Sequence, residues 1–254
     1  MVMQALSASN LLRVWERALG RTAPERALAL LAAACPEMSD EELADLSVGR
    51  RDRLLFALRE RTFGPHMTSL AACDACGESL ELSFDVSDIV DPDETQGELH
   101  AQAPETPELS VEAAGYAAGF RLPNSGDLVA VARARDAAEG RRTLLERCVT
   151  RATRAGASVP PSELPEALVE AVESCMAESD PQADTRLGLD CPACGHHWLA
   201  NFDVVAYLWS EVNAWAYRLL GEVHSLASAY GWREEDILAM SPRRRHVYLE
   251  MVGG

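Results

Sequence analysis

The chain has 254 residues and a net charge of −17 at pH 7, with 40 acidic side chains against 23 basic ones. All the basic side chains are Arg, which excludes enzymes that depend on a P-loop, Schiff-base or general-base Lys. The negative charge repels nucleic acids and anionic membranes as a property of the whole surface.

The pattern of apolar residues predicts a cytoplasmic protein. The longest apolar run, over 27–34, is far shorter than the roughly 20 residues of a membrane-spanning helix, and residues 1–12 lack the features of a secretory signal. In the cytoplasm, the seven Cys are typical of metal ligands or buried residues rather than of disulfides. Three of them have no second Cys at the spacing of a metal-binding pair and are predicted to be core residues: Cys35, Cys148 and Cys175.

The first 62 residues are predicted to be helical. Leu and Trp recur at helical spacing over 10–34, with a break at Gly20 and a restart capped by Thr22. A short helix follows Ser39, and another is predicted over 50–62.

The rest of the chain mixes strands and helices. Leu80, Leu82 and Phe84 alternate with polar residues and predict a strand. A loop is predicted over 91–107 and a hairpin between Leu109 and Leu122. Helices are predicted over 125–155 and 163–178, then from about Asp203 to Tyr230, where Gly231 ends the helix, and two short helices finish the chain.

Two Cys-x-x-Cys-Gly motifs predict a metal site. Cys73 and Cys76 form one pair, and Cys191 and Cys194 form the other. A two-residue gap lets both thiolates of a pair face one ion, and the following Gly permits the tight turn. Four thiolates fill the tetrahedral shell of zinc, so we predict one structural Zn²⁺.

The similarity of the two motifs extends beyond the Cys. Phe84-Asp85-Val86 begins eleven residues after Cys73, and Phe202-Asp203-Val204 begins eleven residues after Cys191. The two units lie 118 residues apart and predict a zinc ribbon that is split between two halves of the chain. The alternatives are four buried thiols or two independent redox pairs. A redox pair normally opens a helix, whereas strands are predicted after these Cys.

The predicted fold is therefore α+β, mainly α-helical with a small split zinc-ribbon β element. We divide it into a helical part (1–62), a first knuckle with an acidic loop and hairpin (63–122), a second helical part (123–180), and a second knuckle with the C-terminal helices (181–254), forming one composite domain.

His196 and His197 follow Cys194 and are expected at the surface or beside the metal ligands, although either could replace a Cys as a ligand.

The sequence does not predict an enzyme. Four thiolates leave no open position on zinc, and motifs such as H-E-x-x-H and G-x-S-x-G are absent. Ser125-Gly-Asp127 is interpreted as a helix cap. Nucleic-acid binding is not favoured, because the acidic chain has one basic cluster, Arg243-Arg244-Arg245, whose side chains spread around a helix.

Four segments resemble baseplate proteins of contractile phage tails and phage-tail-like injection systems: Leu12–Gly20, Phe120–Leu128, Cys191–Trp198 and Tyr230–Glu250. They are similar to the baseplate hub assembly chaperones of T-even bacteriophages, to which the zinc knuckles are not matched. The resemblance implies a baseplate or tail-assembly role, baseplate or tail subunits as protein partners, no membrane partner, and a place in a phage-tail-like particle or in its assembly. The alternative function is a zinc-ribbon nucleic-acid-binding or regulatory protein.

The last 50 residues are rich in aromatic side chains. They either pack around a central helix or form an exposed partner surface with Trp232, Arg243, Arg244, Arg245 and Tyr248.

Overall fold

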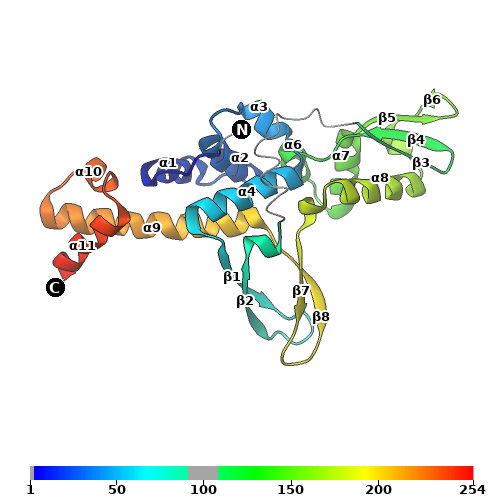
Figure 1. Cartoon of the computed structure of the whole chain (residues 1–254). Coiled ribbons are helices and arrows are strands. Elements are labelled where there is room, and N and C mark those ends of the chain that lie inside the picture. The colour runs from blue at the N-terminus through cyan, green and yellow to red at the C-terminus, as the bar shows by residue number, and fades with distance from the viewer. Residues whose placement is uncertain (1–2, 91–107, 254) are drawn as a thin grey trace.

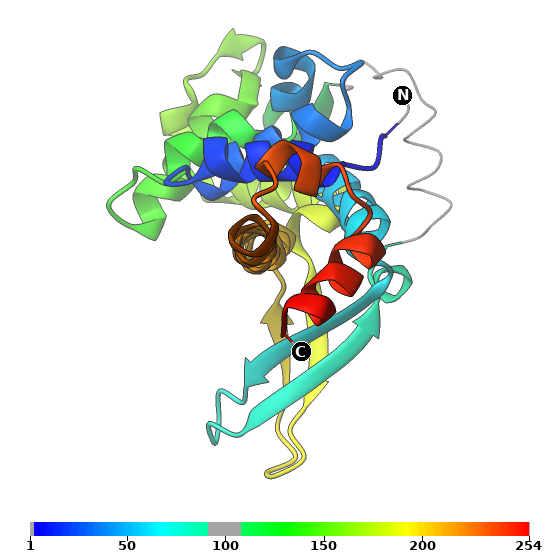
Figure 2. The same ribbon diagram turned by 90° about the vertical axis from the view of Figure 1, so that its left-hand side faces the viewer.

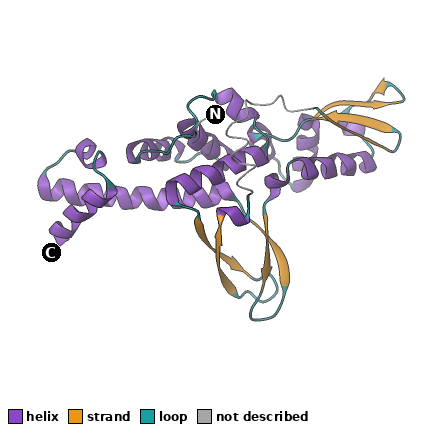
Figure 3. Cartoon of the chain, in the orientation of Figure 1, coloured by secondary structure: helices purple, strands orange, loops and turns teal. Residues whose placement is uncertain are grey.

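The structure is a computed structural model that describes residues 3–90 and 108–253. The predicted loop over 91–107 lies outside the described residues. Helices dominate, and the strands form three small antiparallel sheets within the described part of the chain (Figure 3). The predicted α+β class is therefore confirmed. None of the described helices is both long and apolar enough to cross a membrane.

Each N-terminal helix begins after a Ser or Thr at its N-cap position. Ser7, Thr22, Ser39 and Ser47 precede α1 (Ala8–Ala18), α2 (Ala23–Ala34), α3 (Asp40–Asp45) and α4 (Val48–Phe63). In α2 and α3, a Glu three residues after the cap residue accepts a hydrogen bond from the backbone amide of that residue, which satisfies a donor that the helix leaves unpaired. The predicted break at Gly20 is confirmed, and this residue adopts a φ of +73°.

Two β-hairpins leave the helical body side by side (Figures 1 and 2). The first consists of β1 (His66–Ala72) and β2 (Ser79–Asp85), followed by the short helix η1 (Val86–Asp88). The second consists of β7 (Arg186–Asp190) and β8 (His197–Asn201), preceded by η3 (Pro181–Asp184). Each Cys-x-x-Cys-Gly motif is the turn of one hairpin.

A four-stranded sheet with one helix packed on it forms another part of the molecule. Its order is β3 (Leu109–Ala113), β4 (Tyr116–Phe120), β5 (Val149–Arg154) and β6 (Ala157–Ser158). Leu168 and Val172 of α8 (Glu166–Ser179) pack against Phe120 and Ala152. Between β4 and β5 lie α6 (Ser125–Val131) and α7 (Ala137–Cys148), and η2 (Pro161–Glu163) precedes α8.

The longest helix joins the body to the C-terminal helices. α9 (Val204–Tyr230) begins at Asp203, whose side chain accepts a hydrogen bond from the amide of Ala206, and ends at Gly231, whose φ is +68°. Its first half packs with α1, α2 and α4 in the main core. Its second half carries α10 (Glu234–Leu238) and α11 (Pro242–Gly253), with Val223, Leu226 and Ile237 in a small separate core (Figure 1).

Candidate metal centre

The turns of the two hairpins have the same backbone geometry. In the first, the amide of Cys73 donates to the carbonyl of Glu78 at 2.8 Å, and the amide of Gly77 donates to the carbonyl of Cys73 at 2.8 Å. In the second, both corresponding distances are 2.9 Å, from Cys191 to His196 and from Gly195 to Cys191. Gly77 and Gly195 have φ values of +77° and +73°, which are accessible to Gly without strain. The repeat seen in the sequence is therefore a repeat in three dimensions.

The two turns bring their four sulfur atoms together, all within 4.8 Å of one another. The Sγ of Cys73 lies 3.8 Å from that of Cys194, and the Sγ of Cys76 lies 3.6 Å from that of Cys191. A tetrahedron with metal–sulfur bonds of about 2.3 Å has edges of about 3.8 Å. The four thiols thus fit the coordination shell of one tetrahedral metal ion.

The charges of the cluster also favour a cation. Burial opposes ionisation of Cys191, but the backbone amides of Cys194 and Ala193 donate to its sulfur and lower its pKa to about 7. The amide of Glu78 lowers the pKa of Cys76, but the neighbouring sulfurs raise it to about 12. Closely spaced thiolates repel one another, so a bound divalent cation is needed for all four to ionise together.

Neither His of the second turn belongs to the four-sulfur cluster. Nε2 of His196 lies 2.8 Å from Oδ1 of Asp74, which is in the opposite turn, and its ring stacks on Trp198. His197 contacts Asp190 of its own hairpin at 3.0 Å. His196 therefore forms a contact between the two turns that does not involve the sulfurs.

The sequence profile of the T4 bacteriophage base plate protein family matches residues 21–205. The chain belongs to this family. The searches of curated proteins and of solved structures each gave no significant match. The four Cys of this base plate protein lie within the matched residues, whereas α10 and α11 lie outside them.

The repeat of the base plate protein continues from the hairpin turns into the helical body. The rings of Phe84 and Phe202 meet edge to face at 5.6 Å, and Phe202 also stacks on Phe56 of α4. Asp85 precedes η1, and Asp203 caps α9. Each Phe-Asp pair therefore marks the point where a hairpin ends and a helix begins, which anchors the four-sulfur cluster on the main core.

Two further contacts fix the first hairpin to α4 and α9. The amide of Thr68 in β1 donates to the hydroxyl of Tyr207 at 3.2 Å. The buried Arg59 of α4 forms two hydrogen bonds with Glu211, at 2.8 and 3.0 Å, and donates to the carbonyl of Gly64 just before β1. These residues were not predicted, because their partners are distant in the sequence.

The five residues predicted as a partner surface have different environments. Trp232 and Tyr248 are half-buried, with ring centroids 4.9 Å apart in the small C-terminal core. Arg243 and Arg244 are exposed. Arg245 is buried and donates to Glu222 of α9 at 2.9 Å and to the carbonyl of Met240. We therefore correct the assignment of Arg245: it holds α11 on α9 and is not available to a partner.

Proposed function

We propose that this protein is a non-enzymatic structural component or assembly factor of a contractile phage baseplate, or of a related injection particle. We further propose that one structural Zn²⁺ holds its two hairpins together. The family match over residues 21–205 supports the baseplate role, and the four-sulfur cluster supports the metal.

The donor set favours zinc over other metals. Four thiolates in a tetrahedron are typical of Zn²⁺ or iron–sulfur sites, and paired Cys-x-x-Cys turns are common in structural zinc sites. Zinc would cross-link Cys73 and Cys76 of the first hairpin to Cys191 and Cys194 of the second. Since the protein supplies all four ligands, no position remains for a substrate or an activated water molecule, which supports a structural role.

The surface also supports protein partners over nucleic acid. The chain carries a net charge of −17, and one Arg of its three-Arg cluster is buried against Glu222. The two Arg of this cluster that stay exposed are few compared with the several phosphate contacts of a typical nucleic-acid interface.

The baseplate role is tested by deleting the gene in a strain that produces the particle. We expect contractile particles to be missing or incomplete, and a plasmid copy of the wild-type gene to restore them. Mass spectrometry of purified wild-type particles then separates a retained component from an assembly factor. Normal, fully active particles in the deletion strain would contradict the proposal. If only the transcript levels of tail genes changed, the regulatory alternative would be favoured.

A further inference from the structure

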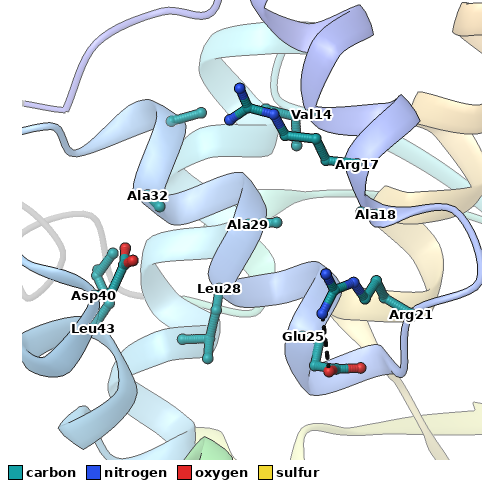
Figure 4. A pocket seen from close by; sticks show the side chains of 11 residues that line it. Val14, Arg17, Ala18, Arg21, Glu25, Leu28, Ala29, Ala32, Asp40 and Leu43 are labelled. Carbon is teal, nitrogen blue, oxygen red and sulfur yellow. Dashed lines mark hydrogen bonds and ion pairs between the residues drawn. The ribbon is translucent and has the colours of Figure 1, made fainter.

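A groove of about 500 Å³ runs along α2, between α1 and α3 (Figure 4). Its apolar lining includes Val14 from α1, Leu28 and Ala29 from α2, and Leu43 from α3. The Ala side chains of α2 are small, so another helix can approach this surface closely. The groove has the form of a site for the apolar side of an amphipathic helix.

The two sides of the groove carry opposite charges. Arg17 and Arg21 lie on the α1 side, and Asp40 lies on the α3 side (Figure 4). Arg21 contacts Glu25 at 3.4 Å across the exposed end of the groove. No ion pair of Arg17 or Asp40 is found within residues 3–90 and 108–253. A helix that binds here therefore needs an acidic residue on one flank and a basic residue on the other.

The last helix of the chain has a matching pattern. Val247 and Met251 are four residues apart on α11 and are 41% and 64% exposed, so they form an apolar stripe without a cover in the described structure. Glu250, paired with His246 at 3.3 Å, lies on one flank of this stripe. Arg244 lies on the other flank, with its guanidinium carbon 5.7 Å from the ring centroid of Tyr248. The stripe points away from α9, because Arg245 and Leu249 face α9 and the small C-terminal core.

We propose that α11 of one copy of this protein binds in the α1–α2–α3 groove of a second copy. Val247 and Met251 insert over the Ala residues of α2, Glu250 faces Arg17, and Arg244 faces Asp40. Both the apolar stripe and the flanking charges are complementary to the groove. The inference does not depend on the baseplate role, because it rests on the shape and charge of these two surfaces.

This contact is head-to-tail, since it joins two different surfaces of the same chain. Each copy keeps a free helix at one end and a free groove at the other, so such contacts produce closed rings or open chains of subunits. One helix in one groove buries a small area and is typical of a weak, reversible contact.

Analytical ultracentrifugation of the full chain, loaded with zinc, tests the proposal over a concentration series. We expect the wild type to associate, and Met251→Asp and Ala29→Glu each to weaken association by at least about tenfold. Leu70→Asp is the matched control, because Leu70 is 75% exposed on β1, away from both surfaces. Circular dichroism and zinc content confirm that the variants are folded.

Mixing the two variants distinguishes the head-to-tail contact from a symmetric one. The Met251→Asp variant retains an intact groove, and the Ala29→Glu variant retains an intact α11. In a mixture, α11 of the second variant can bind in the groove of the first, and no further contact can form. We expect each variant alone to be monomeric and their mixture to form a one-to-one dimer. The proposal is overturned if the wild type is monomeric up to roughly 0.1 mM, where micromolar contacts are populated, if either variant associates as the wild type does, or if the mixture stays monomeric.

Discussion

The four Cys at the hairpin turns have surroundings different from those of the other three Cys. Cys35 is fully buried in the main core, and its burial raises the pKa of the thiol. Burial and the nearby carboxylate of Asp127 raise the pKa of Cys148 to about 12. These thiols are therefore neutral packing groups, whereas the turn thiols face one another at metal-ligand distances.

Replacement of one turn Cys should remove the metal. We expect Cys73→Ser or Cys191→Ser to bind far less than one zinc per chain, as measured by elemental analysis, and to lower the free energy of unfolding by several kcal/mol. Structural zinc contributes roughly 10–16 kcal/mol in peptide sites, and this value is an upper limit for the stability lost with the metal. Cys175→Ala, at a half-buried position in α8, should keep full zinc content and cost about 1 kcal/mol or less. Equal effects of all three changes would show that the ligand set is wrong.

Asp127 is a second residue with a large predicted effect. Its buried carboxylate accepts hydrogen bonds from Arg121 at 2.6 and 3.0 Å, from Arg147 at 2.7 Å and from the amide of Asn124 at 2.9 Å. Burial raises its pKa, but these hydrogen bonds outweigh burial and lower the pKa from 3.8 to about 2. The ionised carboxylate therefore stabilises the fold above pH 3.8, and this stability is lost as the pH falls towards 2.

Asp127→Asn should lower the free energy of unfolding at pH 7 by about 2 kcal/mol, a value kept modest because both Arg partners are partly exposed. Urea unfolding at pH 7 and pH 3 measures the difference in the free energy of unfolding between variant and wild type. We expect this difference to be smaller at pH 3, because part of the wild-type carboxylate is protonated there. Glu139→Gln, which disrupts an exposed ion pair, is the control and should change stability by less than about 1 kcal/mol. A difference independent of pH would contradict the assigned role.

At the scale of secondary-structure elements, two hairpins of the four-stranded sheet have an Ala with positive φ in their turns. Ala114-Gly115 connects β3 to β4, and Ala155-Gly156 connects β5 to β6. All four residues have positive φ, including 52° for Ala114 and 48° for Ala155. Two-residue turns of this kind prefer Asn or Gly at the first position, because Ala in the left-handed region costs roughly 1 kcal/mol.

Ala114→Asn and Ala155→Asn should therefore each raise the free energy of unfolding by about 0.5 kcal/mol. Gly115→Ala is the opposite change at the same turn and should lower it by about 1 kcal/mol. Chemical denaturation at neutral pH measures both. Stabilisation by Gly115→Ala would be inconsistent with the positive φ of Gly115.

Most helices follow from local sequence chemistry. Thr22 caps α2, Gly20 breaks the preceding helix and Gly231 ends α9 as predicted, because caps and left-handed Gly act within a few residues. The helix predicted over 125–155 is wrong after Cys148, where β5 pairs with β4. The β-branched Val149, Thr150 and Thr153 were a local sign of this strand, but its pairing partner is about 30 residues earlier in the chain.

The cluster of four sulfurs was predicted from spacing because both turns carry the same motif. The strands before each turn, β1 and β7, were not predicted, although a strand after a tight turn requires a partner before it. The contact between Asp74 and His196 also has no local signal. It depends on how the two hairpins meet, which is determined by Phe84, Phe202 and the core below them.

At the scale of the whole molecule, the position of the four sulfurs determines which segments should unfold first when the metal is removed. The spacing of the two motifs predicts a zinc ribbon that is split between two halves of the chain. The structure places the sulfurs at the turns of two hairpins that extend from the body (Figure 1), away from the main core of α1, α2, α4 and α9. A ligand that binds only the folded state still stabilises the whole fold by mass action. The first segments to open without the metal should nevertheless be the hairpins, because they have few buried apolar contacts of their own.

Hydrogen–deuterium exchange of the zinc-loaded and chelator-treated protein tests this order of opening. After chelation we expect β1, β2, β7 and β8 to lose protection, and α4 and the first half of α9 to keep theirs, because the ion pair of Arg59 with Glu211 and the buried leucines of α4 remain. The apparent melting temperature should also fall, and added zinc should restore both properties. The control is Cys175→Ala, which should respond to the chelator as the wild type does. Loss of protection in α4 and α9 together with the hairpins would mean that the hairpins and the main core unfold as one cooperative unit. No change in protection anywhere would show that the four thiols do not hold a metal ion.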